Sequence, residues 1–173
     1  MTTTPPAPAD LEARLAALEA LATRVAVLED EREISQLIAA YGPLVDSGAA
    51  AEVAAIWTAD GVYDVDEGHF DGADAIHAMV ESSGHQGWIK GGCAHFLGPV
   101  KVTVHGDEAV AICHSLMVVH GEDGFRVRRA TANHWQLVRT PEGWRATVRT
   151  SRVLDGRPES PALLGAGARG VTP

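Results

Sequence analysis

Hydrophobic residues in the first part of the chain recur at the three- and four-residue spacing of a helix. The series Leu11, Leu15, Leu18, Leu21, Val25 and Leu28 keeps this period, with Glu, Arg and Ala between its members. It predicts a helix that begins at Asp10, whose carboxylate would cap the first turn. The spacing is close to a heptad seam, so we expect contact with another subunit; packing on the sheet of the same chain is the alternative.

A second helical run covers residues 31–45 and contains the dipeptide Gly42-Pro43. Because proline lacks a backbone N–H, this dipeptide should kink or end the helix. Asp46-Ser47-Gly48 then closes the segment. The elements expected next are a short helix over 49–57, a turn over 58–61, a small hairpin over 62–70, a helix capped by Asp71, and a loop over 82–92.

Long strand-like runs dominate the second half of the chain. They cover residues 95–104, 108–120, 125–139 and 144–154, and short turn-rich segments separate them. Helices followed by such an antiparallel meander predict an α+β fold, with helices on one face of a curved sheet. The tail from Gly156 is rich in Gly, Ala and Pro and predicts a mobile arm, although Leu163 and Leu164 could fold over an opening.

Composition narrows the class of protein. A chain of 173 residues with 46% hydrophobic content is expected to form one domain, and its net charge of −9 argues against a nucleic-acid partner. No apolar run is long enough to cross a bilayer, and residues 1–10 do not resemble a secretory signal, so a cytoplasmic location is expected. Residues 1–9, rich in Thr, Pro and Ala, are predicted to be disordered.

The histidines and cysteines show no spacing typical of a metal site. The eight histidines form no HxH, HExxH or His-x-x-x-His pattern, and Cys93 and Cys113 are too far apart for a CxxC pair. Both cysteines are expected to be buried free thiols. No phosphate loop or dinucleotide-binding pattern is found either. The sequence therefore predicts chemistry without a metal or a cofactor.

The strongest candidate for catalysis is His95, which follows the glycine-rich segment Gly91-Gly92 at the mouth of a predicted strand. A neutral imidazole can accept a proton near pH 7, and a carboxylate on its other ring nitrogen would fix the tautomer and stabilise the imidazolium. Asp46, at the end of the preceding helical run, is the predicted partner. The alternatives are that Asp46 is a turn residue and that His95 is a hydrogen-bonded core residue.

Several short motifs, taken together, resemble one known family. They are a helix that ends in Tyr-x-x-x-x-Asp at Asp46, the run 55–63, Phe70-Asp71-Gly72, the strand-opening His95, and Glu142-Gly143-Trp144 before the last strand. Over residues 29–155 the chain resembles the scytalone dehydratase-like and SnoaL-like branch of the nuclear transport factor two-like superfamily. This resemblance implies a cone-shaped sheet around one deep apolar pocket, and a dimer or trimer.

The same resemblance implies a reaction. Its dehydratase and dehydrochlorinase members use an Asp at the Asp46 position and a His at the His95 position as a catalytic dyad. Its dehydrochlorinase-like members also carry a supporting arginine at the position of Arg149, which would suffice for a halide or carboxylate-like leaving group. Either Tyr41 or the protonated His95 would then donate a proton to a hydroxide leaving group. Arg152 lies on the opposite face of a regular strand from Arg149, so one of the two should point outward.

Aromatic and sulfur-containing residues are expected to form the pocket wall. The predicted wall and substrate-contacting residues are Trp57, Trp88, Phe96, Met117, His114 and His134, and the two histidines are alternatively structural. The sequence thus predicts a cofactor-independent lyase, a dehydratase or dehydrohalogenase, for a mainly apolar cyclic substrate. An isomerase or polyketide cyclase that uses the same pair is the first alternative. A non-catalytic ligand-binding protein of the same fold is the second.

Overall fold

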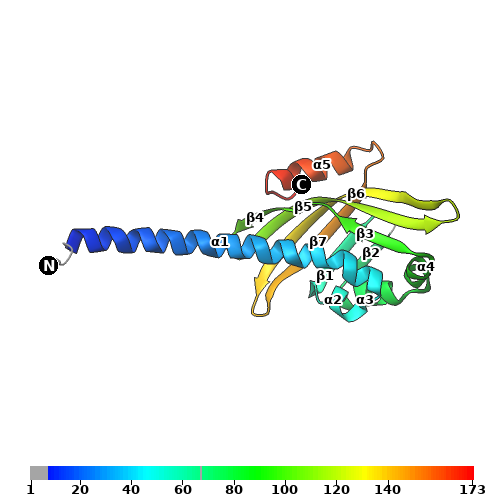
Figure 1. The fold of residues 1–173 in the computed structure, drawn as a ribbon, viewed down its shortest axis with the longest axis horizontal. Coiled ribbons are helices and arrows are strands. Elements are labelled where there is room, and N and C mark those ends of the chain that lie inside the picture. Colours follow the sequence, from blue (N-terminus) through cyan, green and yellow to red (C-terminus); the bar gives the residue numbers. More distant parts are fainter. Residues whose placement is uncertain (1–7, 67) are drawn as a thin grey trace.

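The computed structural model describes residues 8–66 and 68–173. Most of the segment predicted to be disordered, residues 1–9, therefore lies outside the described residues. The described chain is a mixed α+β structure in which helices pack against the faces of one curved sheet (Figure 1). This arrangement confirms the predicted fold class. No helix in the described ranges is long and apolar enough to cross a membrane.

Helix α1 (Pro8–Ser47) joins the two helical runs that were predicted separately. It begins two residues before Asp10, so the predicted cap at Asp10 is wrong. It also continues through Gly42-Pro43 and so does not end there, because the proline removes only the one backbone hydrogen bond that its nitrogen cannot donate. Its first half projects from the body, and its second half lies along the sheet (Figure 1).

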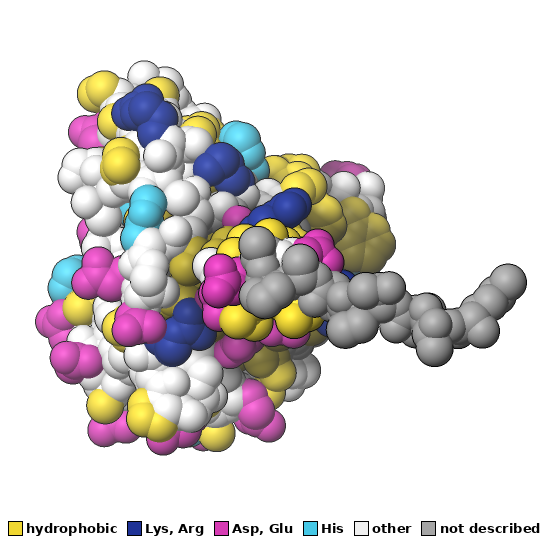
Figure 2. All heavy atoms as spheres, turned by 90° about the vertical axis from the view of Figure 1, so that its left-hand side faces the viewer, with side chains coloured by type: hydrophobic (Ala, Val, Ile, Leu, Met, Phe, Trp, Pro, Cys, Tyr) yellow, Lys and Arg dark blue, Asp and Glu magenta, His cyan; other side chains and the backbone are white. Residues whose placement is uncertain are grey.

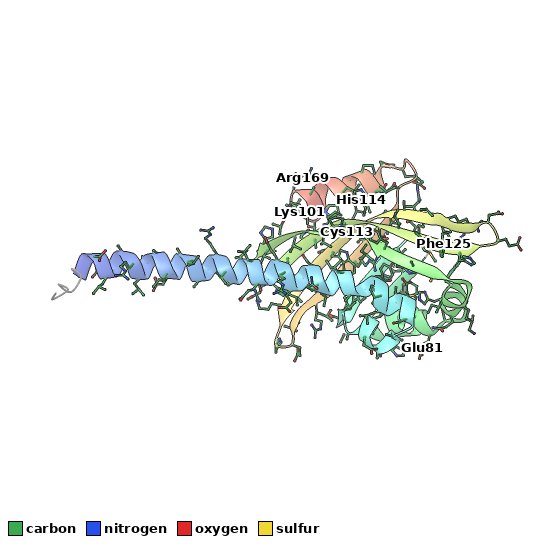
Figure 3. The ribbon with its side chains drawn as sticks, viewed as in Figure 1. Glu81, Lys101, Cys113, His114, Phe125 and Arg169 are labelled. Carbon is green, nitrogen blue, oxygen red and sulfur yellow. The ribbon has the colours of Figure 1, made fainter. Side chains whose placement is uncertain are left out.

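Within the described residues, seven strands form one sheet. They are β1 (Trp57–Val65), β2 (Gly68–Asp71), β3 (Cys93–Leu97), β4 (Lys101–His105), β5 (Glu108–Gly121), β6 (Gly124–Thr140) and β7 (Gly143–Val153). Their order is β2-β1-β7-β6-β5-β3, and β4 also pairs with β5. The predicted hairpins between β5, β6 and β7 are confirmed, and β1 lies parallel to β7. The β5–β6 hairpin extends past the body, with Phe125 near its tip (Figure 3).

The two faces of the sheet are covered by different helices. On the inner face, Trp135 contacts Tyr41 of α1, and the neighbouring pairs Cys113–Asn133 and Trp135–Arg149 share this face. The helix contributes a buried row at helical spacing, Ile34, Ile38, Tyr41 and Val45. The core therefore lies between α1 and the middle of the sheet.

The outer face is covered by α5 (Glu159–Ala168), which replaces the predicted mobile arm. Leu163 is buried, and Gly167 lies so close to Ile112 of β5 that a Cβ could not be accommodated there. His134 of β6 hydrogen-bonds through Nε2 to the Val171 carbonyl at 3.1 Å. The C-terminal segment thus covers the face of the sheet opposite α1 (Figure 1).

Several local predictions for the middle of the chain are corrected. The predicted helix over 49–57 is the shorter α2 (Ala50–Ala54), and the expected turn over 58–61 is an irregular part of β1. Helix α3 (Ala73–Glu81) is capped by Gly72 without a side-chain hydrogen bond, whereas Asp71 binds His69 instead. The strand predicted over 95–104 is divided into β3 and β4 around Gly98-Pro99.

The predicted loop over 82–92 is also wrong, because α4 (Ser83–Gly91) occupies it. Its glycines suggested a loop. However, the Ser82 hydroxyl accepts a hydrogen bond from the backbone N–H of His85 and so caps the first turn. This helix carries His85 and Trp88 toward the region between α1 and the sheet.

Helix α1 is anchored where it enters the body. Arg139 of β6 donates two hydrogen bonds of 2.7 Å to the Asp30 carboxylate, and the Trp144 indole N–H donates to the same carboxylate at 3.0 Å. Glu33 accepts from the Trp144 backbone N–H at 3.0 Å. These contacts set the position of the helix on the β6–β7 hairpin.

The close crossing of α1 and β3 should make Gly42 intolerant of a side chain. A Cβ at position 42 would overlap the carbonyl oxygen of His95. We expect Gly42→Ala to lower the free energy of unfolding by about 2 kcal/mol despite the better helix propensity of alanine. Urea denaturation followed by circular dichroism measures this change.

Gly87→Ala is the matched control, since Gly87 also lies in a helix but a Cβ there meets no atom within 4 Å. It should leave the protein unchanged or stabilise it by up to about 1 kcal/mol. Equal effects of the two substitutions would contradict the steric account of the crossing.

Candidate active site

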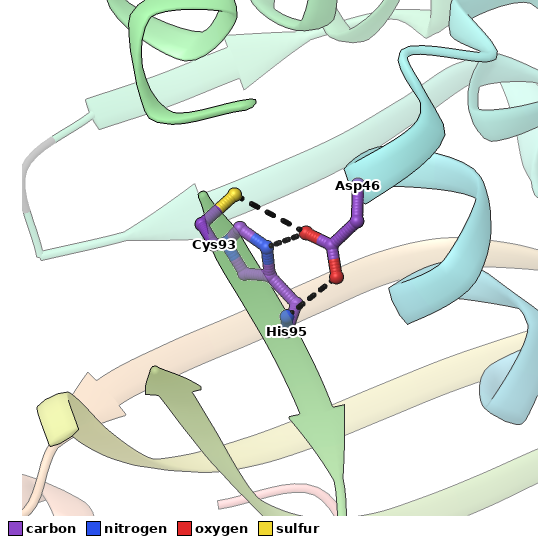
Figure 4. A group of neighbouring side chains, drawn as sticks. All are labelled: Asp46, Cys93 and His95. Carbon is purple, nitrogen blue, oxygen red and sulfur yellow. Dashed lines mark hydrogen bonds and ion pairs between the residues drawn. The ribbon is translucent and has the colours of Figure 1, made fainter. Parts of the chain in front are cut away.

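The structure brings Asp46 and His95 into direct contact at the crossing of α1 and β3 (Figure 4). Nδ1 of His95 and Oδ1 of Asp46 are 2.6 Å apart, and the backbone N–H of His95 donates to Oδ2 at 2.7 Å. Because an ionised carboxylate only accepts hydrogen bonds, Nδ1 carries the proton in this contact. The carboxylate therefore fixes both the position of the strand and the orientation of the ring.

A third donor reaches the same carboxylate. The Cys93 thiol lies 3.6 Å from Oδ1 of Asp46. Burial raises the pKa of Asp46, but the hydrogen bonds from the His95 side chain and backbone outweigh it, so the pKa lies below its ordinary value. The carboxylate is therefore ionised at neutral pH and can stabilise an imidazolium.

His95 faces an apolar neighbourhood through the rest of its ring. With Nδ1 held by Asp46, Nε2 is the nitrogen left for the cavity that His95 lines. The ring of His85 stacks beside it, with centroids 5.9 Å apart and planes inclined by 30°. His85 is held in turn by a hydrogen bond of 2.9 Å from its Nε2 to the Val45 carbonyl. The residue before Asp46 thus positions the second histidine.

The cavity between α1, α4 and the inner face of the sheet has a volume of about 580 Å³. This is within the usual size range of small-molecule sites, roughly 300–1,000 Å³. Most of its wall is aromatic or aliphatic. The lining residues are Tyr41, Tyr63, Val65, Gly68, Phe70, Met79, Ser82, Gly84, His85, Trp88, His95, Met117, Arg128, Arg129 and Val153.

A buried cation lies behind the tyrosines of this wall. The Arg149 guanidinium is stacked 4.1 Å from the ring centroid of Tyr41 and 4.6 Å from that of Tyr63, and it donates twice to the Asn133 side-chain oxygen. Its side chain meets no carboxylate in the described part of the chain, and Nη1 has no hydrogen-bond partner there. Burial raises the pKa of Tyr41, while the Arg149 charge acts in the opposite direction.

This arrangement corrects the predicted position of Arg149. The residue faces inward, which answers the choice between Arg149 and Arg152, but it is only 3% exposed and does not line the cavity. Arg152 lies on the other face and pairs with Asp64 of β1. Arg149 therefore contacts Tyr41 and Tyr63 of the cavity wall and does not reach the cavity itself.

The predicted pocket wall is only partly reproduced. Trp88 and Met117 line the cavity, whereas Trp57 is buried in the core next to Tyr41 and Trp135. Phe96 is 60% exposed, because it alternates with His95 along β3 and points to the other face. His114 and His134 lie on the outer face for the same reason, the first exposed (labelled in Figure 3) and the second under the C-terminal segment.

Residues that could approach one metal ion were found only at this site within the described ranges. They are Asp46, Cys93 and His95. Their ligand atoms are already hydrogen-bonded to one another, and burial, followed by the charge of Asp46, raises the pKa of the Cys93 thiol to about 11. A metal would need the thiolate, which this environment disfavours.

Most of the cavity residues escaped the sequence analysis, among them Tyr63, Phe70, Met79, His85 and Arg128. For His85 a signal existed, since Ser82-x-x-His places the histidine in the first turn of a capped helix. For Arg128 the signal was absent, because its direction depends on an irregularity in the pairing of β5 and β6. The alternation of polar and apolar residues along one strand does not reveal where its pairing with a neighbouring strand is irregular.

The chain is similar to known proteins in both sequence and structure. The SnoaL-like domain family matches residues 26–150. A crystal structure of an NTF2-like protein with a cystatin-like fold from Novosphingobium aromaticivorans is 45% identical, with 85% of this chain and 96% of that chain covered and a TM-score of 0.83. A comparison with curated protein sequences gives no match.

More distant structures share the fold. A protein of unknown function from Mycobacterium tuberculosis is 19% identical, with 88% of this chain and 95% of that chain covered and a TM-score of 0.67. A Catenulispora acidiphila protein in complex with S-DNPA is 21% identical, with 74% and 94% covered and a TM-score of 0.63. At these identities the likeness concerns the architecture alone.

The lowered pKa of Asp46 predicts how stability depends on pH. Because the folded-state pKa lies below the ordinary value of 3.8, ionised Asp46 stabilises the fold above about pH 4, and this contribution is lost as pH falls through the folded-state pKa. The difference in unfolding free energy between wild type and Asp46→Asn should therefore be largest near pH 6 and shrink toward pH 3. Urea denaturation over this range measures it.

Asp74→Asn, at an exposed position of α3, is the control and should change stability little at any pH. A wild-type advantage over Asp46→Asn that stays constant down to pH 3 would show that the carboxylate charge does not contribute.

Proposed function

The chain belongs to the SnoaL-like family of the nuclear transport factor two-like superfamily, and we propose that it is a cofactor-independent lyase. In this proposal His95 removes a proton from carbon while a hydroxide or halide departs from the neighbouring carbon. The observation that supports it most is the contact between Asp46 and Nδ1 of His95, which leaves Nε2 directed to an apolar cavity. The reaction needs no nucleophile, because an elimination requires only a base and an acceptor for the leaving group.

The base step uses the two groups at the crossing of α1 and β3. Nε2 takes the proton, the C–H electron pair forms the new double bond, and the ring becomes an imidazolium. The ionised Asp46 stabilises this cation across the 2.6 Å contact. General-base assistance of this kind accelerates a reaction by roughly a hundredfold to ten-thousandfold.

The leaving group is assisted from the tyrosine side of the cavity. Tyr41 and Tyr63 both line the wall, and Arg149 is stacked behind them. The Arg149 charge opposes the effect of burial, which raises the pKa of Tyr41. A departing hydroxide would accept a proton from a tyrosine hydroxyl or from the protonated His95, and a halide would need hydrogen bonds only. Arg149 is then a positioning and electrostatic residue, not one that touches the substrate.

The substrate expected for this cavity is a mainly apolar cyclic molecule. Phe70, Met79, Trp88 and Met117 supply flat and adaptable apolar surface, and the volume of about 580 Å³ accommodates a molecule of two or three rings. An isomerase or cyclase would use the same proton-transfer pair. Those reactions return the proton to carbon or form a carbon–carbon bond instead of expelling a group.

Substitution of the pair tests the proposal on a panel of cyclic β-hydroxy ketones and halogenated cyclohexanes, with product formation followed by mass spectrometry. His95→Ala should lower kcat by roughly a hundredfold to ten-thousandfold. Asp46→Asn should lower it as well, and the double variant should be little worse than His95→Ala, because the two residues act as a unit. His114→Ala, on the outer face, is the matched control and should retain activity.

Other results would select the alternatives. Exchange of substrate hydrogen for deuterium without loss of a leaving group would favour the isomerase or cyclase. Normal turnover by His95→Ala would refute the role of the pair. Binding of panel compounds without any turnover would favour a non-catalytic protein of this fold.

A further inference from the structure

We propose that the cavity contains a subsite for a carboxylate at Arg128, so that the substrate is an apolar ring system with an acid group at the end remote from the reacting carbon. The reacting end of this description rests on the function proposed above. The subsite itself is defined by binding and can be tested without turnover.

An irregularity in strand pairing places the exposed residue Arg128 at the rim of the cavity. Met117 of β5 pairs with Arg129 of β6, but the next residue, Val118, pairs with Val127, so Arg128 is an extra residue in β6. In a regular strand, neighbouring side chains point to opposite faces, whereas a bulge changes the direction of one of them. Arg128 and Arg129 accordingly both line the cavity.

The two arginines differ in their partners. Arg129 is paired with Asp66 at 3.0 Å. The Arg128 guanidinium lies 4.6 Å from the ring centroid of Trp88, and no ion pair joins it to a carboxylate within residues 8–66 and 68–173. The cation–π contact with Trp88 restrains the guanidinium, and because Arg128 is exposed its N–H groups are accessible to a ligand. The rim of the cavity thus carries a cation that forms no ion pair with a described carboxylate.

The pairing of the strands indicates roughly how far the backbone near this cation lies from that of His95. His95 pairs with Met117 and Met117 pairs with Arg129, so the three residues form one row across β3, β5 and β6. Two strand spacings separate His95 from Arg129, roughly 10 Å between backbones. Met117 lies between them, and Trp88 borders the Arg128 end. A ligand of two or three fused rings spans this distance.

The chemistry of the site favours a carboxylate. A guanidinium binds a carboxylate through two parallel hydrogen bonds, and the carboxylate of an aromatic acid continues the plane of its ring system. A single unbalanced cation suits a monoanion better than a dianionic phosphate. The apolar wall between Arg128 and His95 would carry the hydrocarbon part of the acid.

A matched pair of probes tests the subsite. Binding of 2-naphthoate and of 2-naphthamide, which have the same ring system, is measured by isothermal titration calorimetry at low salt. Wild type should bind the acid at least about tenfold more tightly than the amide, in line with a charged hydrogen bond in a partly exposed site. Arg128→Gln should lose this preference, and Arg128→Lys should retain part of it.

Arg126→Gln is the matched control, because Arg126 is an exposed arginine of the same strand that does not line the cavity. It should retain the full preference for the acid. Equal binding of acid and amide by wild type, no detectable binding of the acid, or an unchanged preference in Arg128→Gln would each overturn the subsite. Thermal melts of the variants separate a lost site from a lost fold.

This test is independent of the lyase proposal. Naphthoate offers no leaving group, so its binding does not depend on His95. A preference for the acid without elimination of any panel compound would leave the subsite standing and count against the lyase. Efficient elimination from neutral compounds that Arg128→Gln does not affect would support the lyase and count against the carboxylate subsite.

A separate observation supports a second proposal: the projecting half of α1 forms a parallel two-stranded coiled coil with a second copy of this chain. Every residue from Asp10 to Glu29 is exposed, including Leu18 at 62%. Figure 2, viewed from the side from which α1 projects, shows hydrophobic and acidic side chains around the helix. A helix with no tertiary packing is marginal in water, so a partner is needed to stabilise it.

The spacing of the apolar residues specifies the partner. Leu11, Leu18 and Val25 occupy every seventh position, and Leu21 and Leu28 occupy the complementary positions three residues later, with Arg14 as an interruption. In a parallel pair this register places Arg24 opposite Glu29 of the second copy, which is an attractive pairing. From Leu18 to Glu29 the seam is therefore complementary to itself, whereas Arg14 weakens the pairing near its beginning.

Cysteine cross-linking tests this register in the full chain. Leu21→Cys should form a disulfide-linked dimer under mild oxidation, because the seam brings position 21 of the two copies together. Ala20→Cys, one residue around the helix, should cross-link much less. Non-reducing electrophoresis measures the yield. Equal yields from the two variants, or no covalent dimer from Leu21→Cys, would overturn the proposal.

Discussion

One carboxylate connects the fold to the candidate site. Asp46, near the end of α1, accepts hydrogen bonds from both the backbone and the ring of His95, at 2.7 and 2.6 Å. The backbone contact holds the beginning of β3 against the helix, and the ring contact sets the direction of the imidazole. The absence of a side chain at Gly42, one turn earlier, allows the two segments to come this close. Structure and proposed chemistry therefore depend on the same atoms.

The two faces of the sheet have different roles: the inner face borders the core and the cavity, and the outer face packs against α5. Its inner face meets α1 and carries the aromatic layer in which Arg149 is buried, while its outer face is covered by α5. The cavity lies toward the end of the inner face at which α4 and the β5–β6 bulge converge. An apolar wall with a proton-transfer pair at one side and an oriented cation at the other is suited to an elongated, weakly polar molecule. The two proposals on this cavity describe the two ends of one ligand.

Particular residues show how far prediction from the sequence reached. The α+β class and the hairpins of β5, β6 and β7 follow from alternation and turn residues, both of which are local, and they are confirmed. The proximity of Asp46 and His95 was expected by resemblance, and their catalytic role stays a prediction. Helix α4 was missed because its glycines indicate a loop, whereas the Ser82 cap and contacts with α1 stabilise a helix. The wall residues Phe96, His114 and His134 were misplaced because alternation defines two faces without telling which one is inner.

The sequence by itself determined the periods: two helical runs with apolar residues at helical spacing, four long strand-like runs, and a histidine that follows a glycine-rich segment at the start of a predicted strand. These depend on residues a few positions apart, and the chain carries that information locally. Only the tertiary structure decided which side chains of each helix or strand face the core. A shift of one residue in pairing exchanges the faces, as the extra residue Arg128 does for its own side chain. Pairings between distant segments determine the burial of Arg149, the stacking of His85 on His95 and the direction of the Arg128 side chain. These features could therefore not be predicted from the order of residues alone.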